Sequence, residues 1–355
     1  MKMRFLWSLA TILAVISLLG ACAAPAPTTP AAPPTPSLPA NTVGAVKTDT
    51  APAIDATVDT AWSKAKPLTI NVSGGQNLPN GSTTVELRAL YTADTIYFLA
   101  QWADPTDTVR RAPWQKQADG SWTKLKDPND KGGDNNLYYE DKMAFIWNIN
   151  DSIAGFNEQG CMVTCHVGEP GKAFGNKYTA NAGETGDIWH WKSIRTGTVG
   201  QIDDQYVDNT RYDAAKSPEA GRKSDPKTGG GYIDNQTDDK KLPKFALAGN
   251  KPAPPYWIAD SAKAAFENAS YKPNDEVPGI IVAPFTGDRG DLASKNAYKD
   301  GKYTLEWSRK LNTGSQFDVQ FSDLSKTYAF GVAVFENAQV RHAFSGGASK
   351  LVFIK

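Results

Sequence analysis

Alternation between apolar and polar residues is the main pattern in this chain. It runs through residues 85–91 and, after a Thr-Ala-Asp turn, through residues 95–102. A period of two places alternate side chains on one buried face, so these two segments predict a β-hairpin. Residues 141–150 predict another strand. Its apolar face would carry Met143, Phe145, Trp147 and Ile149.

The C-terminal third of the chain alternates in the same way. Residues 303–308, 317–321 and 328–335 each predict a strand, and Gly, Asn and Ser turns separate them. A last strand is predicted near residues 351–354. The sequence contains neither a long 3.6-residue apolar period nor an internal repeat. We therefore predict an all-β fold, a single antiparallel β-sandwich with long loops and a few short helices, in which the N- and C-terminal strands meet.

The N-terminal segment predicts export and lipidation. Lys2 and Arg4 precede an apolar run at residues 5–18 that is too short for a comfortable membrane span. The Leu-Gly-Ala-Cys sequence that follows resembles the lipobox of bacterial lipoproteins, which predicts a signal peptide at residues 1–21 and a lipid on Cys22. An ordinary signal peptide cut at a nearby small residue is the alternative. Both interpretations place the protein outside the cytoplasm, and the lipobox adds an anchor to a bacterial membrane.

Composition divides the rest of the chain. Residues 22–40 are almost entirely Ala, Pro, Thr and Ser, which favours an extended tether. Residues 41–355 are expected to form one domain. Within it, residues 216–255 are poor in apolar side chains and predict a long surface insertion with little regular structure. Asp238 and Asp239 in this insertion are candidates for Ca²⁺ binding, but their spacing fits no EF-hand and solvated charge explains them better.

The overall charge excludes one class of partner. The chain has 38 basic and 38 acidic residues, so its formal charge is zero and no basic field is available to recruit nucleic acid. Ten Trp, thirteen Tyr and fourteen Phe favour a β-rich body with large flat side chains. The sequence also lacks a Walker loop, a dinucleotide-binding Gly pattern and a supported catalytic triad.

A short segment in the middle of the chain concentrates the reactive residues. It holds two of the three cysteines and one of the three histidines, in the order Cys161-x-x-x-Cys165-His166. Covalent haem attachment needs two thiols for the vinyl groups and a histidine directly after the second thiol. The segment therefore predicts one haem c, with His166 as the proximal iron ligand. A Cys161–Cys165 disulfide, a zinc site and a buried pair of free thiols are the alternatives.

The sixth iron ligand has several candidates. His190 is the first choice, because it lies in an apolar segment near the cysteines along the chain. The further candidates, in order, are Met143, His342 and Met162. A second histidine would favour a lower reduction potential than a methionine thioether. Three tryptophans are expected to pack against the macrocycle and exclude water: Trp147, Trp189 and Trp191.

Several weak motifs occur in the order found in one known family. They are Asp55-x-x-x-Asp59-x-x-Trp62, the Gln-Trp-Ala-Asp-Pro sequence at 101–105, Asp141-Lys142, the Asp-Ile-Trp-His-Trp-Lys sequence at 187–192, the strand at 328–335 and Arg341-His342. With them, the chain resembles the haem-binding family typified by the gamma subunit of ethylbenzene dehydrogenase and its relatives in the DMSO-reductase superfamily. The resemblance covers residues 45–355. It implies a β-sandwich that holds one haem and passes single electrons, with a respiratory complex or molybdenum enzyme as partner.

The chain departs from that family at the iron. The gamma subunits carry a non-covalent b-type haem held by Met and Lys, whereas Cys161, Cys165 and His166 imply covalent attachment. Met143 and Lys192 lie in neighbourhoods that match those of the family ligands. Each of them is therefore a further candidate for the sixth ligand.

One function is favoured and two alternatives stay open. The favoured function is a membrane-tethered, extracytoplasmic c-type cytochrome that exchanges electrons with a redox protein partner and does not turn over a substrate. One alternative is a haem-free sugar-binding sandwich with a Cys161–Cys165 disulfide and an aromatic platform. That platform would comprise Trp102, Trp114, Trp122 and Trp257. The other alternative is a haem enzyme with an open distal face.

Overall fold

The computed structural model describes residues 38–129, 137–166 and 177–355, and most of its regular structure is β-strand. The one α-helix in these ranges, α1, covers only Phe156–Gln159. None of the helices in these ranges has the length and apolar character needed to cross a membrane. The all-β prediction is confirmed. The predicted signal peptide, the lipidation site Cys22 and most of the predicted tether lie outside the described residues.

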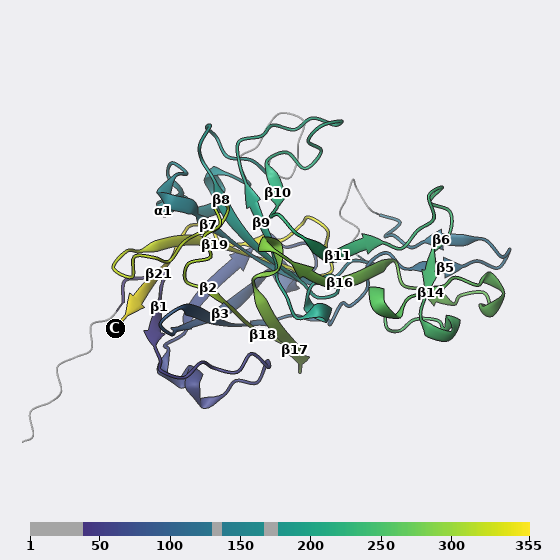
Figure 1. Cartoon of the computed structure of the whole chain (residues 1–355), viewed down its shortest axis with the longest axis horizontal. Coiled ribbons are helices and arrows are strands. Elements are labelled where there is room, and N and C mark those ends of the chain that lie inside the picture. The colour runs from purple at the N-terminus through teal and green to yellow at the C-terminus, as the bar shows by residue number, and fades with distance from the viewer. Residues whose placement is uncertain (1–37, 130–136, 167–176) are drawn as a thin grey trace, which may run out of the picture. The chain divides into compact units, whose positions relative to one another are not determined.

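The main sheet has thirteen strands and folds into two packed layers (Figure 1). The first layer contains, in spatial order, β10 (Arg222–Ser224), β9 (Asp203–Val207), β8 (Gly186–Lys192), β7 (Lys142–Asn148) and β19 (Tyr328–Phe335). The second layer contains β2 (Leu68–Ser73), β3 (Ser82–Tyr91), β4 (Thr95–Ala103), β18 (Lys302–Lys310) and β17 (Ala293–Lys299). The strands that join the layers are β20 (Ala343–Phe344), β21 (Ser349–Ile354) and β1 (Thr42–Lys47). The predicted hairpin corresponds to β3 and β4, which pair antiparallel.

The two ends of the described chain meet along one edge of the sandwich. β1 pairs with β21 in parallel, from Thr42 opposite Lys350 to Val46 opposite Ile354. β1 also pairs in parallel with β3, whereas the other ladders of this sheet are antiparallel. The prediction that the terminal strands meet is correct, although the N-terminal strand that does so had no alternating signal of its own.

In the described part of the chain three smaller sheets accompany the sandwich, and β5, β6 and β14 lie at the right of Figure 1. Their strands are β11 (Gly229–Asp234), β16 (Ile280–Thr286) and β13 (Ile258–Ala259); β12 (Phe245–Ala246) and β14 (Ala264–Ala265); and β15 (Glu276–Val277), β5 (Trp114–Lys116) and β6 (Trp122–Lys124). Residues 216–255 contain β10, β11 and β12, so this segment is more regular than predicted. Its strands find partners at a distance in sequence, such as β16 for β11.

Short 3₁₀ helices connect many of the strands. In the described ranges they are η1 (Thr60–Lys64), η2 (Pro79–Gly81), η3 (Ile149–Asp151), η4 (Gly160–Val163), η5 (Gly197–Val199), η6 (Ala248–Asn250), η7 (Asp260–Ala262), η8 (Asn268–Ser270) and η9 (Asp288–Gly290). Asp59 caps η1, because its side chain accepts a hydrogen bond from the Ala61 N–H at 2.7 Å.

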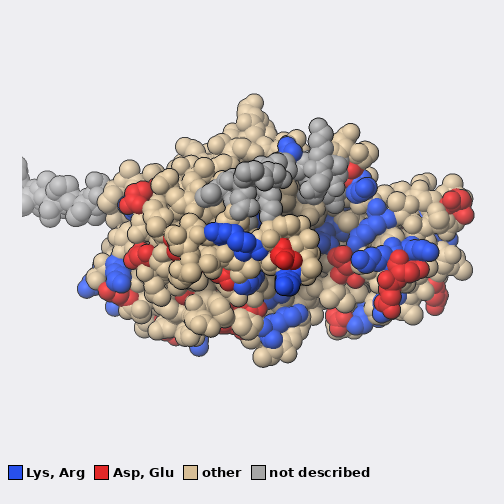
Figure 2. Space-filling view, turned by 90° about the horizontal axis from the view of Figure 1, so that it is seen from above, with Lys and Arg blue, Asp and Glu red and all other residues tan. Residues whose placement is uncertain are grey.

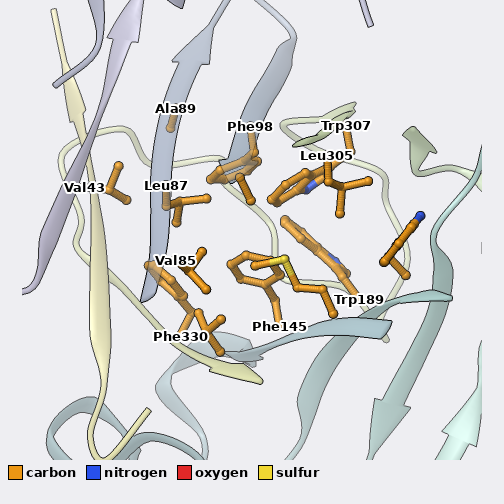
Figure 3. Close-up of a cluster of buried hydrophobic side chains, with 14 of the residues drawn as sticks. Val43, Val85, Leu87, Ala89, Phe98, Phe145, Trp189, Leu305, Trp307 and Phe330 are labelled. Carbon is orange, nitrogen blue, oxygen red and sulfur yellow. The ribbon is translucent and has the colours of Figure 1, made fainter. Parts of the chain in front are cut away.

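Aromatic side chains from both layers fill the core. Phe98 of β4 stacks on Trp307 of β18 with ring centroids 5.1 Å apart, and its ring also meets Trp189 of β8 at 5.8 Å. Figure 3 shows these side chains between the layers, with Phe145 and Phe330 beside them. Burial of each large apolar side chain stabilises the fold by about 1.5–3 kcal/mol. This packing on the core side of β7, β8 and β19 fixes the positions of these three strands.

One predicted strand is wrong. Residues 317–321 form a loop, because their backbone N–H groups have partners outside any ladder. The Val319 N–H donates to Asp187 Oδ2 at 2.9 Å, and the Phe321 N–H donates to the Leu311 carbonyl at 2.7 Å. The apolar alternation that suggested a strand reflects Val319 and Phe321, which are both buried in the core.

Candidate functional site

A pocket of about 560 Å³ lies on the outer face of β7 and β8, opposite the core. The strand period of two sends alternate side chains into it. The pocket side chains of these two strands are Lys142, Ala144 and Ile146 from β7 and Ile188, His190 and Lys192 from β8. The other walls come from β19, from the Cys161–His166 segment and from residues near 220 and 340. Its volume falls in the range of small-molecule and cofactor sites.

The segment after α1 brings all three predicted haem-binding residues to this pocket. Cys161, Cys165 and His166 line it together. The chain curls because the N–H groups of Thr164 and His166 both donate to the Cys161 carbonyl, at 3.2 and 3.3 Å. Gly160 makes the turn possible: its φ is +57°, and a Cβ there would lie 3.1 Å from the backbone at residues 347–348.

Both thiols are free, with Cys161 buried and Cys165 half-buried. Cys161 is 6% exposed, and burial together with the neighbouring Cys165 raises its pKa to about 12. Burial also raises the pKa of Cys165. Gly331 of β19 lies beside this segment: a Cβ at that position would be in ordinary contact with the Cys161 Cβ at 3.5 Å and would crowd Ile146 Cγ2 at 3.1 Å. Met162 points outward, is 37% exposed and does not line the pocket.

His166 and His342 face each other directly. Their Nε2 atoms are 3.4 Å apart and their ring centroids 5.2 Å apart. The His342 Nδ1 lies 2.7 Å from the Val340 carbonyl, which can only accept, so Nδ1 carries the proton and the Nε2 lone pair accepts a hydrogen bond from His166 Nε2. Burial, with a contribution from His166, lowers the pKa of His342 to about 3, and burial lowers that of His166. Both rings are therefore neutral and suited to bind a metal.

His190, the first-ranked distal candidate, also lies in the pocket, but deeper against β8 and β9. Its Nδ1 is 3.2 Å from Gln205 Oε1, and its buried Nε2 has no hydrogen-bond partner in the described part of the chain. Burial, with the positive charges of Lys192 and Lys142, lowers its pKa well below the usual value. The ring packs on Phe335 at 5.5 Å, whereas His342 contacts His166 itself. Of these two histidines, His342 is the one that lies against His166.

The predicted haem-packing tryptophans lie on the wrong face. Trp147, Trp189 and Trp191 are fully buried in the sandwich core, and none of them lines the pocket (Figure 3 shows Trp189). Met143 shares that core. The reason is the strand period: neighbours of His190 on a strand must point away from it. A group in the pocket would contact Phe335 instead, so these four residues are removed from the candidate site.

The pocket is strongly basic. The acidic residue among the described residues that line it is Glu219. The basic residues of the lining are Arg111, Lys142, Lys177, Lys192, Arg195 and Arg222. Lys192 pairs with Asp203, and Arg195 with the buried Glu140. Figure 2 shows Lys and Arg side chains on this side of the molecule, around a recess and in its depth. A ligand with negatively charged groups would fit this lining.

Of the six basic residues that line the pocket, Lys142 is the one that forms no ion pair with an acidic side chain in the described part of the chain. Its Nζ donates to the Gln339 carbonyl at 2.8 Å and lies 3.9 Å above the Phe335 ring. Burial, with repulsion from Arg195, lowers its pKa well below the usual value. A carboxylate entering the pocket would supply the missing counter-charge.

The residues present fit a covalently bound haem. Two thiols and an adjacent histidine line one wall, a second histidine faces the first, and the buried His190 Nε2 is unpartnered. The basic lining suits the propionate groups. Zinc fits less well, because the described residues place no group of three Cys, His or acidic ligand atoms at this pocket. The Asp238–Asp239 pair, by contrast, shows solvated charge: Asp238 is exposed and pairs with Lys244 at 4.0 Å.

Comparisons with known proteins give one clear relationship. None of the curated proteins matches this chain. Two solved structures of a carbohydrate binding module family 9 from Caldicellulosiruptor kristjanssonii, in complex with glucose and with cellotriose, align at 7% and 8% identity with a TM-score of 0.33 each. The alignments cover 87% and 88% of this chain and 94% and 93% of those chains. The family model described as Ethylbenzene dehydrogenase matches residues 59–345, and the chain therefore belongs to the ethylbenzene dehydrogenase family.

Proposed function

We propose that this protein is an extracytoplasmic electron-transfer cytochrome that carries one covalent haem c in the pocket. Cys161 and Cys165 would form the thioethers, and His166 and His342 would be the two axial ligands. The observation that carries the proposal is the opposed histidine pair beside two free thiols. Its Nε2–Nε2 separation of 3.4 Å is close to the roughly 4 Å that two imidazole–metal bonds span.

The residues around the pair support this role. When bound, the haem supplies a one-electron couple at its iron. Val340 holds His342 in the tautomer that presents Nε2, and the shielded position of both rings keeps them unprotonated. Lys142 is placed to pair with a propionate, since it has no carboxylate of its own. Its charge would also stabilise the reduced state relative to the oxidised state.

Electron transfer, and not substrate turnover, is the activity that follows from two protein ligands. If His166 and His342 both hold the iron, they would leave it no open position for a substrate. The partner is then another redox protein, and the family points to a respiratory or molybdenum enzyme. Lipid attachment at Cys22 would hold the protein at a membrane surface on the outer side of the cytoplasmic membrane, within reach of such a partner.

A spectrum tests the proposal. The protein is matured with a c-type assembly system beside a Cys161→Ser/Cys165→Ser double variant, and pyridine haemochrome spectra are compared after acid-acetone extraction. A c-type α-band that survives extraction in the parent and is lost in the double variant supports covalent haem. Absence of haem from the parent under competent maturation would refute the proposal.

The haem-free sugar-binding alternative has no support from the tryptophans on which it relied. Trp102, Trp114 and Trp122 are buried, at 1%, 2% and 7% exposure, and Trp102 belongs to a different cluster from the other two. They cannot form one exposed platform with Trp257. The disulfide that this alternative required is likewise not formed, since Cys161 and Cys165 are free.

A further inference from the structure

A cluster of aspartates lies on the core side of β8, away from the pocket. Asp187 belongs to β8, Asp204 to β9 and Asp318 to the loop after β18, and one oxygen from each lies within 4.8 Å of the others. Asp225, just after β10, approaches Asp318, and Asp291, just after η9, approaches Asp204. Five carboxyl groups from distant parts of the sequence therefore converge here.

Four of these carboxyl groups are buried and Asp291 is half-buried, and the group has few hydrogen-bond donors. The exposed fraction is 0% for Asp187 and Asp204, 1% for Asp318 and 2% for Asp225. Six oxygens have no hydrogen-bond partner among the described residues: Asp187 Oδ1, Asp204 Oδ2, both oxygens of Asp225, Asp291 Oδ1 and Asp318 Oδ1. Buried polar atoms in native proteins nearly always have partners, because an unpaired one is costly. So many together indicate a missing ligand.

Asp203, the neighbouring aspartate on β9, is a buried carboxylate whose hydrogen-bond partners are present. Asp203 points to the outer face, where it accepts hydrogen bonds from Lys192, Arg289 and Tyr232. Despite burial, the two cations lower its pKa. Asp204, one residue later, points to the inner face, and its donor is the N–H of Gln205 at 3.1 Å.

The positive charge at the cluster is insufficient. Among the described residues, Arg309 is the basic side chain that forms ion pairs with the cluster. Its Nη1 lies 3.0 Å from Asp187 Oδ2 and 3.5 Å from Asp318 Oδ2. One guanidinium thus faces five carboxyl groups. Burial and the charges of Asp187 and Asp318 raise the pKa of Asp204 well above its usual value. The cluster therefore has to bind either protons or a cation.

Protons alone do not satisfy it. One proton shared between Asp225 and Asp318 and another between Asp204 and Asp291 would pair four of the six unpartnered oxygens. Asp187 Oδ1 and the second oxygen of Asp225 would still lack a partner. A multivalent cation could contact all of them at once.

We propose that this cluster binds one Ca²⁺ ion, with Asp187, Asp204 and Asp318 as ligands and Asp225 and Asp291 completing the shell. Ca²⁺ takes six to eight oxygens at about 2.3–2.6 Å, so ligands on opposite sides of the ion lie about 4.6–5.2 Å apart. The three central oxygens lie within 4.8 Å of one another. Mg²⁺ is smaller and keeps several waters, and softer metals prefer nitrogen or sulfur, which this site lacks.

The ion would tie three segments together. It bridges the first residues of β8 and β9 to the loop that carries Asp318, and that loop already binds β8 through the Val319 N–H. It would also hold the end of β8 whose other face forms the pocket. The site does not depend on the bound haem.

Calcium binding is measured directly on the mature protein. The protein is treated with EGTA, dialysed and titrated with CaCl₂ in a calorimeter, and thermal unfolding is followed with and without the ion. We expect one equivalent to bind and the melting temperature to rise. In Asp204→Asn the affinity should fall by more than about tenfold. Asp225→Asn replaces it if that variant fails to fold.

The matched control is Asp104→Asn. Asp104 belongs to a second buried acidic group with Asp141 and Glu336, in which backbone N–H and hydroxyl groups supply most of the partners. Binding that survives in Asp104→Asn but not in Asp204→Asn supports the proposal. The proposal is overturned if the parent binds no Ca²⁺, if binding disappears in Asp104→Asn instead, or if Asp204→Asn binds as the parent does.

Discussion

The two faces of strand β8 are equally buried but chemically opposite. On the outer face, His190 and Lys192 belong to a basic pocket with an excess of positive charge. On the inner face, Trp189 packs in the aromatic core and Asp187 in an acidic cluster with an excess of negative charge. The outer face is covered by loops and the inner face by the second layer. The degree of burial therefore does not tell which β8 side chains line the pocket and which pack in the core. The face of the strand on which a side chain lies does.

The largest expected effect separates the two faces by stability. Trp189→Ala removes a fully buried indole from the core and should lower the free energy of unfolding by about 3–5 kcal/mol. His190→Ala, on the next residue, should cost less because its ring lies at the pocket. Denaturant unfolding of the two variants measures the difference. Equal losses would show that the outer face is as much a part of the core as the inner one.

The proposed second iron ligand, His342, gives the next effect, now on the outer face. His342→Ala removes the imidazole that faces His166, so the matured protein should become high-spin and bind carbon monoxide readily. His190→Ala is the matched control and should keep the low-spin spectrum of the parent. Absorption spectra with and without carbon monoxide provide the measurement. The reverse result would restore His190 as the distal ligand.

The pH dependence of stability probes the buried acids. Burial, with Glu336 beside it, raises the pKa of Asp104 from 3.8 to about 9. The folded state then binds a proton that the unfolded state has released, so this stabilisation is complete below about pH 4 and is lost as the pH rises towards about 9. Melting temperatures should fall between about pH 5 and pH 8, and less steeply in Asp104→Asn. An unchanged slope in the variant would assign the effect to other groups.

The smallest effect concerns the pocket charge. Lys142→Leu removes a buried cation next to the proposed propionate position, so the reduction potential should fall. Lys177→Leu is the control, since Lys177 is more exposed and pairs with Glu219. A redox titration of both variants and the parent measures the shift. A larger shift in Lys177→Leu would place the negative groups of the haem at the rim.

The sequence was sufficient to predict the β-sandwich and the cysteines and histidines of the pocket, but not the rest of its lining. Apart from residues 317–321, the alternating segments correspond to strands. Cys161, Cys165, His166, His190 and His342 all line one pocket. The pairing of His166 with His342 could not be predicted, because it joins residues 176 positions apart. Only the antiparallel arrangement of the strands and loops brings them together.

Two errors have a physical explanation. The tryptophans next to His190 were grouped with it by proximity in sequence, although successive residues of a strand point to opposite faces. Residues 317–321 form a loop but alternate like a strand. Val319 and Phe321 are buried in the core, and Asp318, the residue before Val319, belongs to the acidic cluster. The cluster itself gave no signal, since its aspartates are scattered from Asp187 to Asp318.

The parallel pairing of β1 with β21 bears on how the protein is made. Thr42 lies opposite Lys350, so β1 obtains this neighbour only after the residues up to β21 have been synthesised. Such a long-range contact forms slowly, because the intervening chain has to be ordered first. A nascent polypeptide without its last few residues would leave the edge of β1 open. Until β21 pairs with it, the open edge of β1 offers unpaired N–H and C=O groups to a strand of another molecule.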